Sequence, residues 1–262
     1  MTRVDVNTIA TAGAAKLDYS RKYPLRYFSR AAMAGAFIMV GSLISTLSAA
    51  YFYQTQLGVA KLLGAACFAT ALILIVLLGG ELFTGANFVM SVSLYEKKVS
   101  LSGVLRIWVF CYLGNLLAIF VLALIVVGSG ASTELMASYL TAVVPAKLQG
   151  AWYVLLLKGV LCNFLVCAGV FAGLKLKSES GKCIAIIAVI TTFVLAGYEH
   201  SVANMATFSL YALLVPGADF GGIVWNMLWV TLGNIIGGGA LLGLPVWFSA
   251  EPASKSNEEN ER

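Results

Sequence analysis

Six long apolar runs dominate this chain and restrict it to folds that can bury them in lipid. The runs lie near residues 31–53, 60–80, 104–128, 151–174, 183–197 and 222–250. Most of them reach the length of about 20 residues that a helix needs to cross the hydrocarbon core of a bilayer. Only 11% of the 262 residues are charged, against about a quarter in soluble domains. We therefore predict an all-α integral membrane protein.

Charge and cysteine usage exclude several other classes. The net charge of +5 is modest and fits the topology of a membrane protein better than nucleic-acid binding. The five cysteines lie in or beside apolar runs without CxxC or Cys/His metal spacing, so we expect buried, unreactive thiols, no metal site and no cofactor. The first thirty residues contain six basic residues and lack a compact apolar core, so no cleavable signal peptide is expected.

Two polar segments interrupt the second and fifth apolar runs. Residues 79–85 (GGELFTG) form one, and residues 196–204 (AGYEHSVAN), which include the only histidine of the chain, form the other. Ionisable residues at membrane depth are costly, so each marks a candidate functional site. Apolar residues continue over 82–95 and 201–215. We therefore predict six spans, with the second and fifth discontinuous, and a translocation pathway where they meet.

A weak internal repeat relates two halves of the chain, at about 29–130 and 150–250. Glu81 and Glu199 are 118 residues apart. The asparagines of two Leu-Gly-Asn triplets, Asn115 and Asn234, are 119 residues apart. A repeat unit with three spans must invert in the membrane, which gives a pseudo-two-fold axis in the bilayer plane. We predict such an inverted 3+3 repeat.

Basic residues in the loops predict that both termini are cytoplasmic. Lysine and arginine precede the first run and recur in the loops at 96–106 and 175–182. The alternate loops contain at most one lysine each, at 54–61, 129–150 and 214–222. Cytoplasmic loops carry the excess of positive charge in membrane proteins, so this distribution sets the orientation.

Four segments together resemble the formate/nitrite transporter family, which includes formate, nitrite and hydrosulfide channels. The segments are 80–85 (GELFTG), 157–163 (LKGVLCN), 197–205 (GYEHSVANM) and 230–238 (VTLGNIIGG). The resemblance covers about residues 5–250. It implies an aquaporin-like protomer of six spans that assembles as a homopentamer. Each protomer would carry its own pore, and membrane lipid would plug a non-conducting central axis.

The resemblance also implies which residues line the pore. Thr84 and His200 would face each other at mid-pore, with Asn204 one helical turn beyond His200. The hydrophobic constrictions would be formed by Phe68, Leu72, Leu82 and Phe193, with Phe83 adjacent. Lys147, in a loop sixteen residues before Asn163, would line the outer vestibule.

These residues predict how a small monovalent anion would pass. A full charge cannot cross a dry apolar constriction at an acceptable free energy. Lys147 would concentrate the anion at the mouth, while Thr84 and Asn204 would replace its hydration. The unperturbed pKa of histidine lies near physiological pH, so His200 could donate a proton to the anion or carry a compensating charge. We predict a pH-influenced channel for nitrite, formate or hydrosulfide, without enzyme activity.

The family resemblance predicts the location of the protein, and the residue pattern predicts the division of the chain. We expect a bacterial or archaeal cytoplasmic membrane. Residues 1–28 would form a lead-in with a cytoplasmic amphipathic helix, whose apolar face lies at the membrane surface or against a neighbouring subunit. Residues 29–250 would form the six-span channel domain, and residues 251–262 a disordered cytoplasmic tail.

Several roles have alternatives that the residues leave open. A lone histidine among apolar residues is often a packing residue. Glu81 and Glu199 would accept hydrogen bonds from backbone N–H groups freed at the helix breaks, or carry protons. Lys158, about two turns into the fourth span, would be a structural counter-ion for one of these glutamates or would line the pore.

The function has alternatives as well. A proton-coupled secondary transporter with moving gates would use the same histidine. A membrane redox enzyme would need haem-ligating histidine pairs or a quinone site, which a single histidine argues against. The short tail and the segments at 157–163 and 197–204 are closer to the nitrite or hydrosulfide branches than to the formate branch. The same residues would serve all three anions.

Overall fold

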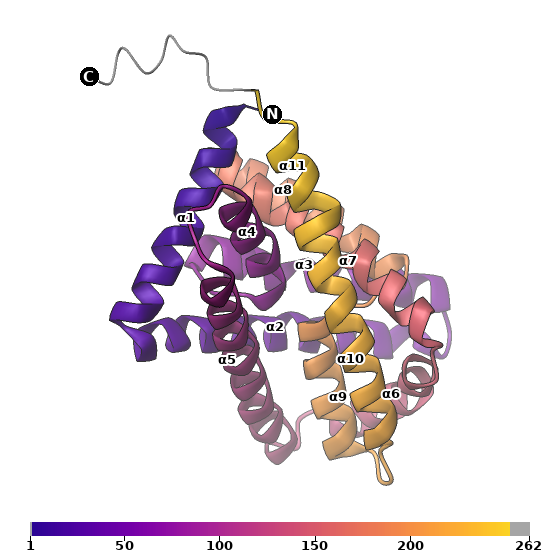
Figure 1. Cartoon of the computed structure of the whole chain (residues 1–262). Coiled ribbons are helices and arrows are strands. Elements are labelled where there is room, and N and C mark those ends of the chain that lie inside the picture. Colours follow the sequence, from indigo (N-terminus) through magenta and orange to yellow (C-terminus); the bar gives the residue numbers. More distant parts are fainter. Residues whose placement is uncertain (1, 252–262) are drawn as a thin grey trace, which may run out of the picture.

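The computed structural model describes residues 2–251, and every regular element in that range is a helix (Figure 1). Apart from Glu251, the tail for which disorder was predicted lies outside the described residues. The elements in chain order are α1 (Arg3–Lys22), α2 (Pro24–Tyr53), α3 (Leu57–Leu78), α4 (Phe83–Tyr95), α5 (Leu101–Gly128), α6 (Thr133–Leu148), α7 (Trp152–Lys175), α8 (Glu179–Leu195), α9 (Ser201–Leu214), α10 (Phe220–Ile236), η1 (Gly237–Gly243) and α11 (Leu244–Phe248).

Five helical stretches are long and apolar enough to cross a membrane. They are α2, α3, α5, α7 and the continuous stretch Phe220–Phe248, which joins α10 to α11 through the π-helical η1. A helix satisfies its own backbone hydrogen bonds, so such stretches can lie in lipid. The prediction of an all-helical fold with several long apolar helices is confirmed for the described residues. The fifth predicted run is divided between α8, of 17 residues, and α9, of 14 residues.

Short non-helical segments separate α3 from α4 and α8 from α9. Gly79 lies at the end of α3 with φ 79°, and Gly197 follows α8 with φ 72°. Glycine adopts this left-handed backbone at little cost because it has no Cβ. Both polar interruptions of the sequence are therefore places where a helix ends and a new, shorter one begins.

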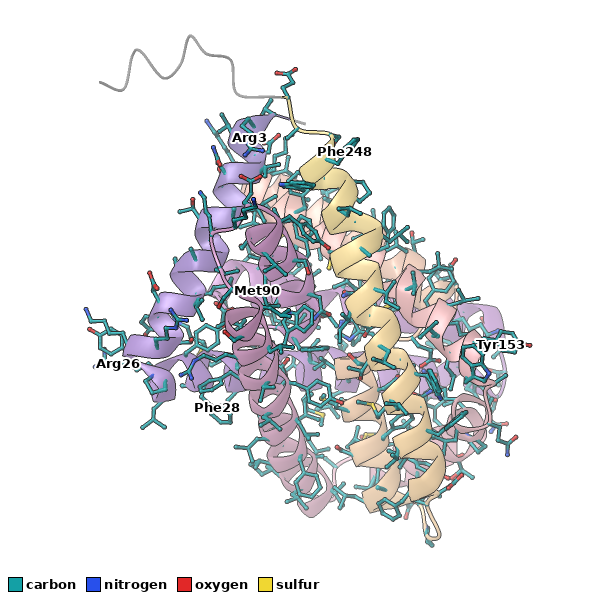
Figure 2. The ribbon with its side chains drawn as sticks, in the orientation of Figure 1. Arg3, Arg26, Phe28, Met90, Tyr153 and Phe248 are labelled. Carbon is teal, nitrogen blue, oxygen red and sulfur yellow. The ribbon has the colours of Figure 1, made fainter. Side chains whose placement is uncertain are left out.

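The apolar face of α1 packs on helices of the same chain rather than on a partner. Val6, Ile9 and Leu17 are buried, and the Ser93 hydroxyl of α4 donates to the carbonyl of Ala10 at 3.2 Å. At the far end, the Glu96 carboxylate binds the Arg3 guanidinium and accepts a hydrogen bond from the indole of Trp247. This contact brings α1, α4 and α11 together, and Figure 2 shows Arg3 and Phe248 at that end.

The loop expected at 129–150 contains a helix instead. In α6, Met136, Leu140, Val144 and Leu148 recur every four residues and are buried. A stripe of this spacing lies along one face of a helix. The interpretation of Lys147 as a loop residue was therefore wrong, since it lies in the last turn of α6.

Candidate functional site

Two cavities lie on either side of the helix breaks. The larger, of about 490 Å³, is here called the Lys147 vestibule and is lined among others by Lys61, Lys147, Lys158, Glu199 and His200. The smaller, of about 300 Å³, is called the Lys16 vestibule and is lined among others by Lys16, Arg30, Leu72, Glu81 and Leu82. The two cavities have no lining residue in common.

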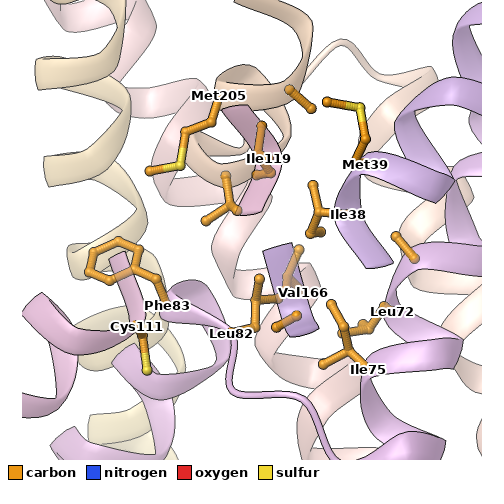
Figure 3. Close-up of a cluster of buried hydrophobic side chains, with 14 of the residues drawn as sticks. Ile38, Met39, Leu72, Ile75, Leu82, Phe83, Cys111, Ile119, Val166 and Met205 are labelled. Carbon is orange, nitrogen blue, oxygen red and sulfur yellow. The ribbon is translucent and has the colours of Figure 1, made fainter. Parts of the chain in front are cut away.

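Buried apolar side chains are among the lining residues of each vestibule. Phe68 and Phe193 line the Lys147 vestibule, with ring centroids 6.0 Å apart in an edge-to-face arrangement. Leu72 and Leu82 line the Lys16 vestibule. All four belong to one hydrophobic cluster, and Figure 3 shows Leu72 and Leu82 in it beside Val166. Side chains of one buried apolar cluster therefore line both cavities.

Phe83 lines neither cavity, unlike these four side chains. Its ring packs edge-to-face on Tyr112 of α5, with centroids 5.1 Å apart, and it lines neither vestibule. In Figure 3 its side chain extends away from Leu82. The structure therefore gives Phe83 a packing contact with α5 in place of the predicted constriction.

Thr84 and His200 meet where α4 and α9 begin. Thr84 Oγ1 lies 3.0 Å from His200 Nε2, and both side chains are buried. Thr84 is in the first turn of α4, and His200 is the N-cap of α9. The N-termini of two short helices therefore converge on one point. Each carries a partial positive charge from its aligned peptide dipoles.

The hydrogen bonds of His200 determine its tautomer. Its Nδ1 accepts the backbone N–H of Ala203 at 3.0 Å, which caps α9. A ring nitrogen that accepts a hydrogen bond carries no proton, so we assign the proton of the neutral ring to Nε2. That N–H faces Thr84. A second proton on Nδ1 would abolish the cap. Phe193 stacks on the imidazole with ring planes 23° apart.

Asn115 of α5 binds the first helix break. Its Nδ2 donates to the carbonyl oxygens of Ala31 (2.8 Å) and Glu81 (3.0 Å). Its Oδ1 accepts the backbone N–H of Phe83 at 3.0 Å. One buried amide thus satisfies three backbone groups. One is on α2, one lies within the break and one is at the start of α4.

Asn234 of α10 binds the second break in the same pattern. Its Nδ2 donates to the carbonyl oxygens of Gly159 (2.9 Å) and Glu199 (3.0 Å). Its Oδ1 accepts the backbone N–H of Ser201 at 2.8 Å. The sequence repeat had singled out both asparagines but not this role.

The carboxylates of Glu81 and Glu199 bind side chains instead of the freed backbone N–H groups. Both oxygens of Glu81 accept from Lys16 Nζ at 2.6 Å, and one accepts from the hydroxyl of Tyr27 at 3.0 Å. Glu199 Oε2 accepts from Lys147 Nζ at 2.7 Å. The expectation that these carboxylates satisfy the broken backbone was wrong, because the two asparagines occupy that position.

Lys147 holds Asn204 as well as Glu199. Its Nζ lies 3.2 Å from Asn204 Oδ1. Asn204 Nδ2 in turn donates to Glu199 Oε2 and to Asn226 Oδ1, both at 2.8 Å. Asn226 Nδ2 donates to the carbonyl of Lys147 at 2.9 Å and closes the network. Asn226 was not predicted as a site residue, because it lies within the apolar run at 222–250 and belongs to none of the four family motifs.

Lys158 contributes to the second break through its backbone. Its carbonyl accepts the N–H of Glu199 at 3.4 Å, as the carbonyl of Arg30 accepts the N–H of Glu81 at 3.1 Å. Among residues 2–251 its ammonium forms no ion pair with a carboxylate. The expected pairing of Lys158 with a glutamate was wrong, since Lys16 and Lys147 take those places.

Asn163 supports Thr84 from α7. Its Nδ2 donates to the carbonyls of Thr84 (3.1 Å) and Asn234 (2.7 Å) and to Asn87 Oδ1 (3.1 Å). It therefore joins the start of α4 to α10. Within the described part of the chain, no group of three or more His, Cys, Asp or Glu side chains is arranged to hold a metal ion.

The chain resembles proteins that carry anions. The family model described as "Formate/nitrite transporter" matches residues 4–248. The nitrite transporter NirC of Escherichia coli (strain K12) is 34% identical over 254 residues, which cover 95% of this chain and 93% of that protein.

Two solved structures have the same fold. The one titled "FNT family ion channel" matches with a TM-score of 0.86 and 32% identity, over 94% of this chain and 99% of its own. A second, "Pentameric formate channel with formate bound", matches with a TM-score of 0.75 and 28% identity, over 87% and 98%.

Proposed function

Because this chain belongs to the formate/nitrite transporter family, we propose that it conducts small monovalent anions of weak acids across the cytoplasmic membrane. Nitrite, formate and hydrosulfide are the candidates. As a member of this family the protein is a membrane transport protein and not an enzyme. The convergence of α4 and α9 at the contact between Thr84 and His200 carries the proposal.

We propose that the six spans form an inverted 3+3 repeat and that five copies of the chain assemble, as in the solved pentameric relative. The matching hydrogen bonds of Asn115 and Asn234 support the repeat. With both termini in the cytoplasm of a bacterium or archaeon, the Lys16 vestibule faces the cytoplasm. The Lys147 vestibule then faces outward. Each protomer carries its own pore, and lipid fills the central axis.

The mid-pore provides hydrogen-bond donors for an anion in place of water. The Nε2–H of His200 points to Thr84 and would donate to an anion that takes the place of this hydroxyl. The N-termini of α4 and α9 add partial positive charge without a formal cation. Hydrogen bonds of Asn204 with Glu199 and Lys147 hold one wall of the pore in place. The partial positive charge at the N-termini of α4 and α9 disfavours cations in the mid-pore.

In this proposal Phe68, Phe193, Leu72 and Leu82 form an apolar barrier between the two vestibules. The anion must cross this barrier with its charge neutralised or shared. Phe68, Phe193, Leu72 and Leu82 offer no polar group, and desolvating a full charge there is prohibitive. Transfer of the Nε2 proton alone would leave an anionic imidazole ring. The proton that neutralises the anion therefore comes from the vestibule water, and His200 orients and polarises the anion. Flux follows pH through this protonation.

Flux measurements on purified protein in liposomes test the proposal. We expect nitrite, formate or hydrosulfide to pass while larger inorganic anions do not. Absence of flux for all three anions would remove the proposed function. A proton-coupled transporter with moving gates is the second candidate, and it predicts saturation at low concentration with a fixed proton stoichiometry.

A further inference from the structure

The charges of the Lys147 vestibule are not balanced. Lys61, Lys147 and Lys158 are among the residues that line this cavity, and Glu199 is the one acidic residue among them. The Lys147 ammonium already binds Glu199 at 2.7 Å. Lys147, the residue that family resemblance places at the mouth as an anion attractor, is thus the cation whose charge is locally compensated.

Lys158 lines this cavity, forms no ion pair among the described residues and also contacts the break. It is half-buried on α7, and its own carbonyl binds the backbone of Glu199. A cation at this depth is costly unless something pairs with it. Arg30, in the equivalent place of the other half, lies 4.5 Å over the ring of Tyr19. Within residues 2–251, Lys158 has neither a carboxylate nor an aromatic ring of this kind.

We propose that Lys158 creates an anion-binding site in the Lys147 vestibule, where the permeating anion binds before it reaches Phe68 and Phe193. This inference rests on the proposed function and names Lys158, not Lys147, as the residue that captures the anion. Lys147 instead positions Asn204 through their hydrogen bond and the shared carboxylate of Glu199.

Formate flux at graded concentrations tests this site. Removing one charge several ångströms from the anion weakens its attraction by an amount that depends strongly on the local dielectric. For Lys158→Met we expect the half-saturating formate concentration to rise on the order of three- to tenfold, with the maximal rate close to that of the wild type. Lys158→Arg should restore the wild-type value. Lys182→Met, on α8 and outside both vestibules, is the matched control.

Two further measurements separate the effect of losing the Lys158 charge from an effect of the substitution on packing. An impermeant salt should raise the half-saturating concentration of the wild type more than that of Lys158→Met, because screening acts on the charge. Right-side-out and inside-out membrane vesicles should differ, since Lys158 lines only one vestibule. If Lys158→Met assembles poorly, Lys158→Gln serves in its place.

The outcomes distinguish this site from the proposed function. A wild-type protein that carries no formate, nitrite or hydrosulfide overturns both. A conducting wild type together with a well-assembled Lys158→Met of unchanged half-saturation and salt dependence overturns the Lys158 site alone. A lower maximal rate at unchanged half-saturation also overturns it, because that result assigns Lys158 to the structure of the break.

Discussion

Asn115 and Asn234 make the same three hydrogen bonds to the two halves of the molecule. The Nδ2 of each asparagine donates to two carbonyl oxygens, one of a glutamate in the break and one on α2 or α7. The Oδ1 of each accepts the backbone N–H of the residue that starts α4 or α9. The two helix breaks are therefore maintained by two equivalent buried amides. Neither break depends on the carboxylate of its glutamate.

Replacing either asparagine with leucine should destabilise the protein. Asn115→Leu leaves one N–H and two carbonyls without their partner, and each unsatisfied buried group costs about 1–3 kcal/mol. We expect a loss of several kcal/mol, seen as a lower thermal midpoint in detergent. Asn234→Leu should have a similar effect because its bonds are equivalent. Midpoints equal to the wild type in both variants would contradict this role.

His200→Asn should preserve the fold and change the pH dependence of flux. Asparagine is a good N-cap and can accept the N–H of Ala203 as the imidazole does. It lacks the Nε2–H that polarises the anion for protonation from the vestibule water, so we expect assembly to be intact and half-maximal flux to require a lower pH than in the wild type. Native mass spectrometry and liposome flux measure the two properties. Identical profiles would exclude His200 from the mechanism.

Lys147→Glu should depress anion uptake strongly. The substitution places a second carboxylate beside Glu199 and removes the contact of Lys147 with Asn204. Like charges at this distance repel, and burial strengthens the repulsion. Uptake of nitrite and formate in liposomes is the measurement. Lys177→Glu, at a residue that lines neither vestibule, is a control of equal charge change, and wild-type rates in Lys147→Glu would remove Lys147 from the mechanism.

Gly238→Ala should destabilise the contact between η1 and α7. Its Cβ would lie 2.7 Å from Asn163 Nδ2 and 2.9 Å from Cys167 Sγ. Overpacking of this kind costs about 1–3 kcal/mol, and it would also disturb the support of Thr84. Gly58→Ala, where a Cβ meets nothing within 4 Å, is the matched control. Thermal unfolding should separate the two variants.

The docking of α1 should weaken in acid. The pKa of Asp5 is lowered from its usual 3.8, first by the hydrogen bond from the Thr2 backbone and then by one from Lys175. A lowered pKa means that the stabilisation is complete above the usual value and is lost as the pH falls through the lowered one. Hydrogen exchange of α1 should accelerate over that range. Asp5→Asn, which removes the charge, should reduce the dependence.

The apolar runs predicted most of the helices because their signal is local. Length and hydropathy alone identify α2, α3, α5, α7 and the stretch from Phe220. The partners of Glu81 and Glu199 could not be assigned in this way. They lie on α1 and α6, and the segment that contains α6 was predicted to be a loop. Contacts between residues 52 to 65 positions apart, such as Lys16 with Glu81 and Lys147 with Glu199, leave no local pattern.

The site residues divide in the same way. Thr84 and His200 were predicted as neighbours by resemblance, and the structure brings them to 3.0 Å. The role of Asn226 and the tautomer of His200 could not be predicted from the sequence. Both follow from how the side chains are oriented in the folded protein. Residues that are neighbours in sequence need not share a role. Phe83 follows Leu82, yet its ring packs on Tyr112 of α5.

The π-helical segment η1 has a consequence for how closely the last long helical stretch approaches its neighbours. A π turn bonds each residue to the fifth instead of the fourth along the chain, so it is wider than an α-helical turn. A Cβ at Gly237 would clash with the carbonyl oxygen of Val160 on α7, and one at Gly239 would lie 2.7 Å from the hydroxyl oxygen of Ser91 on α4. Any larger residue at either position would push the stretch Phe220–Phe248 away from one of these helices.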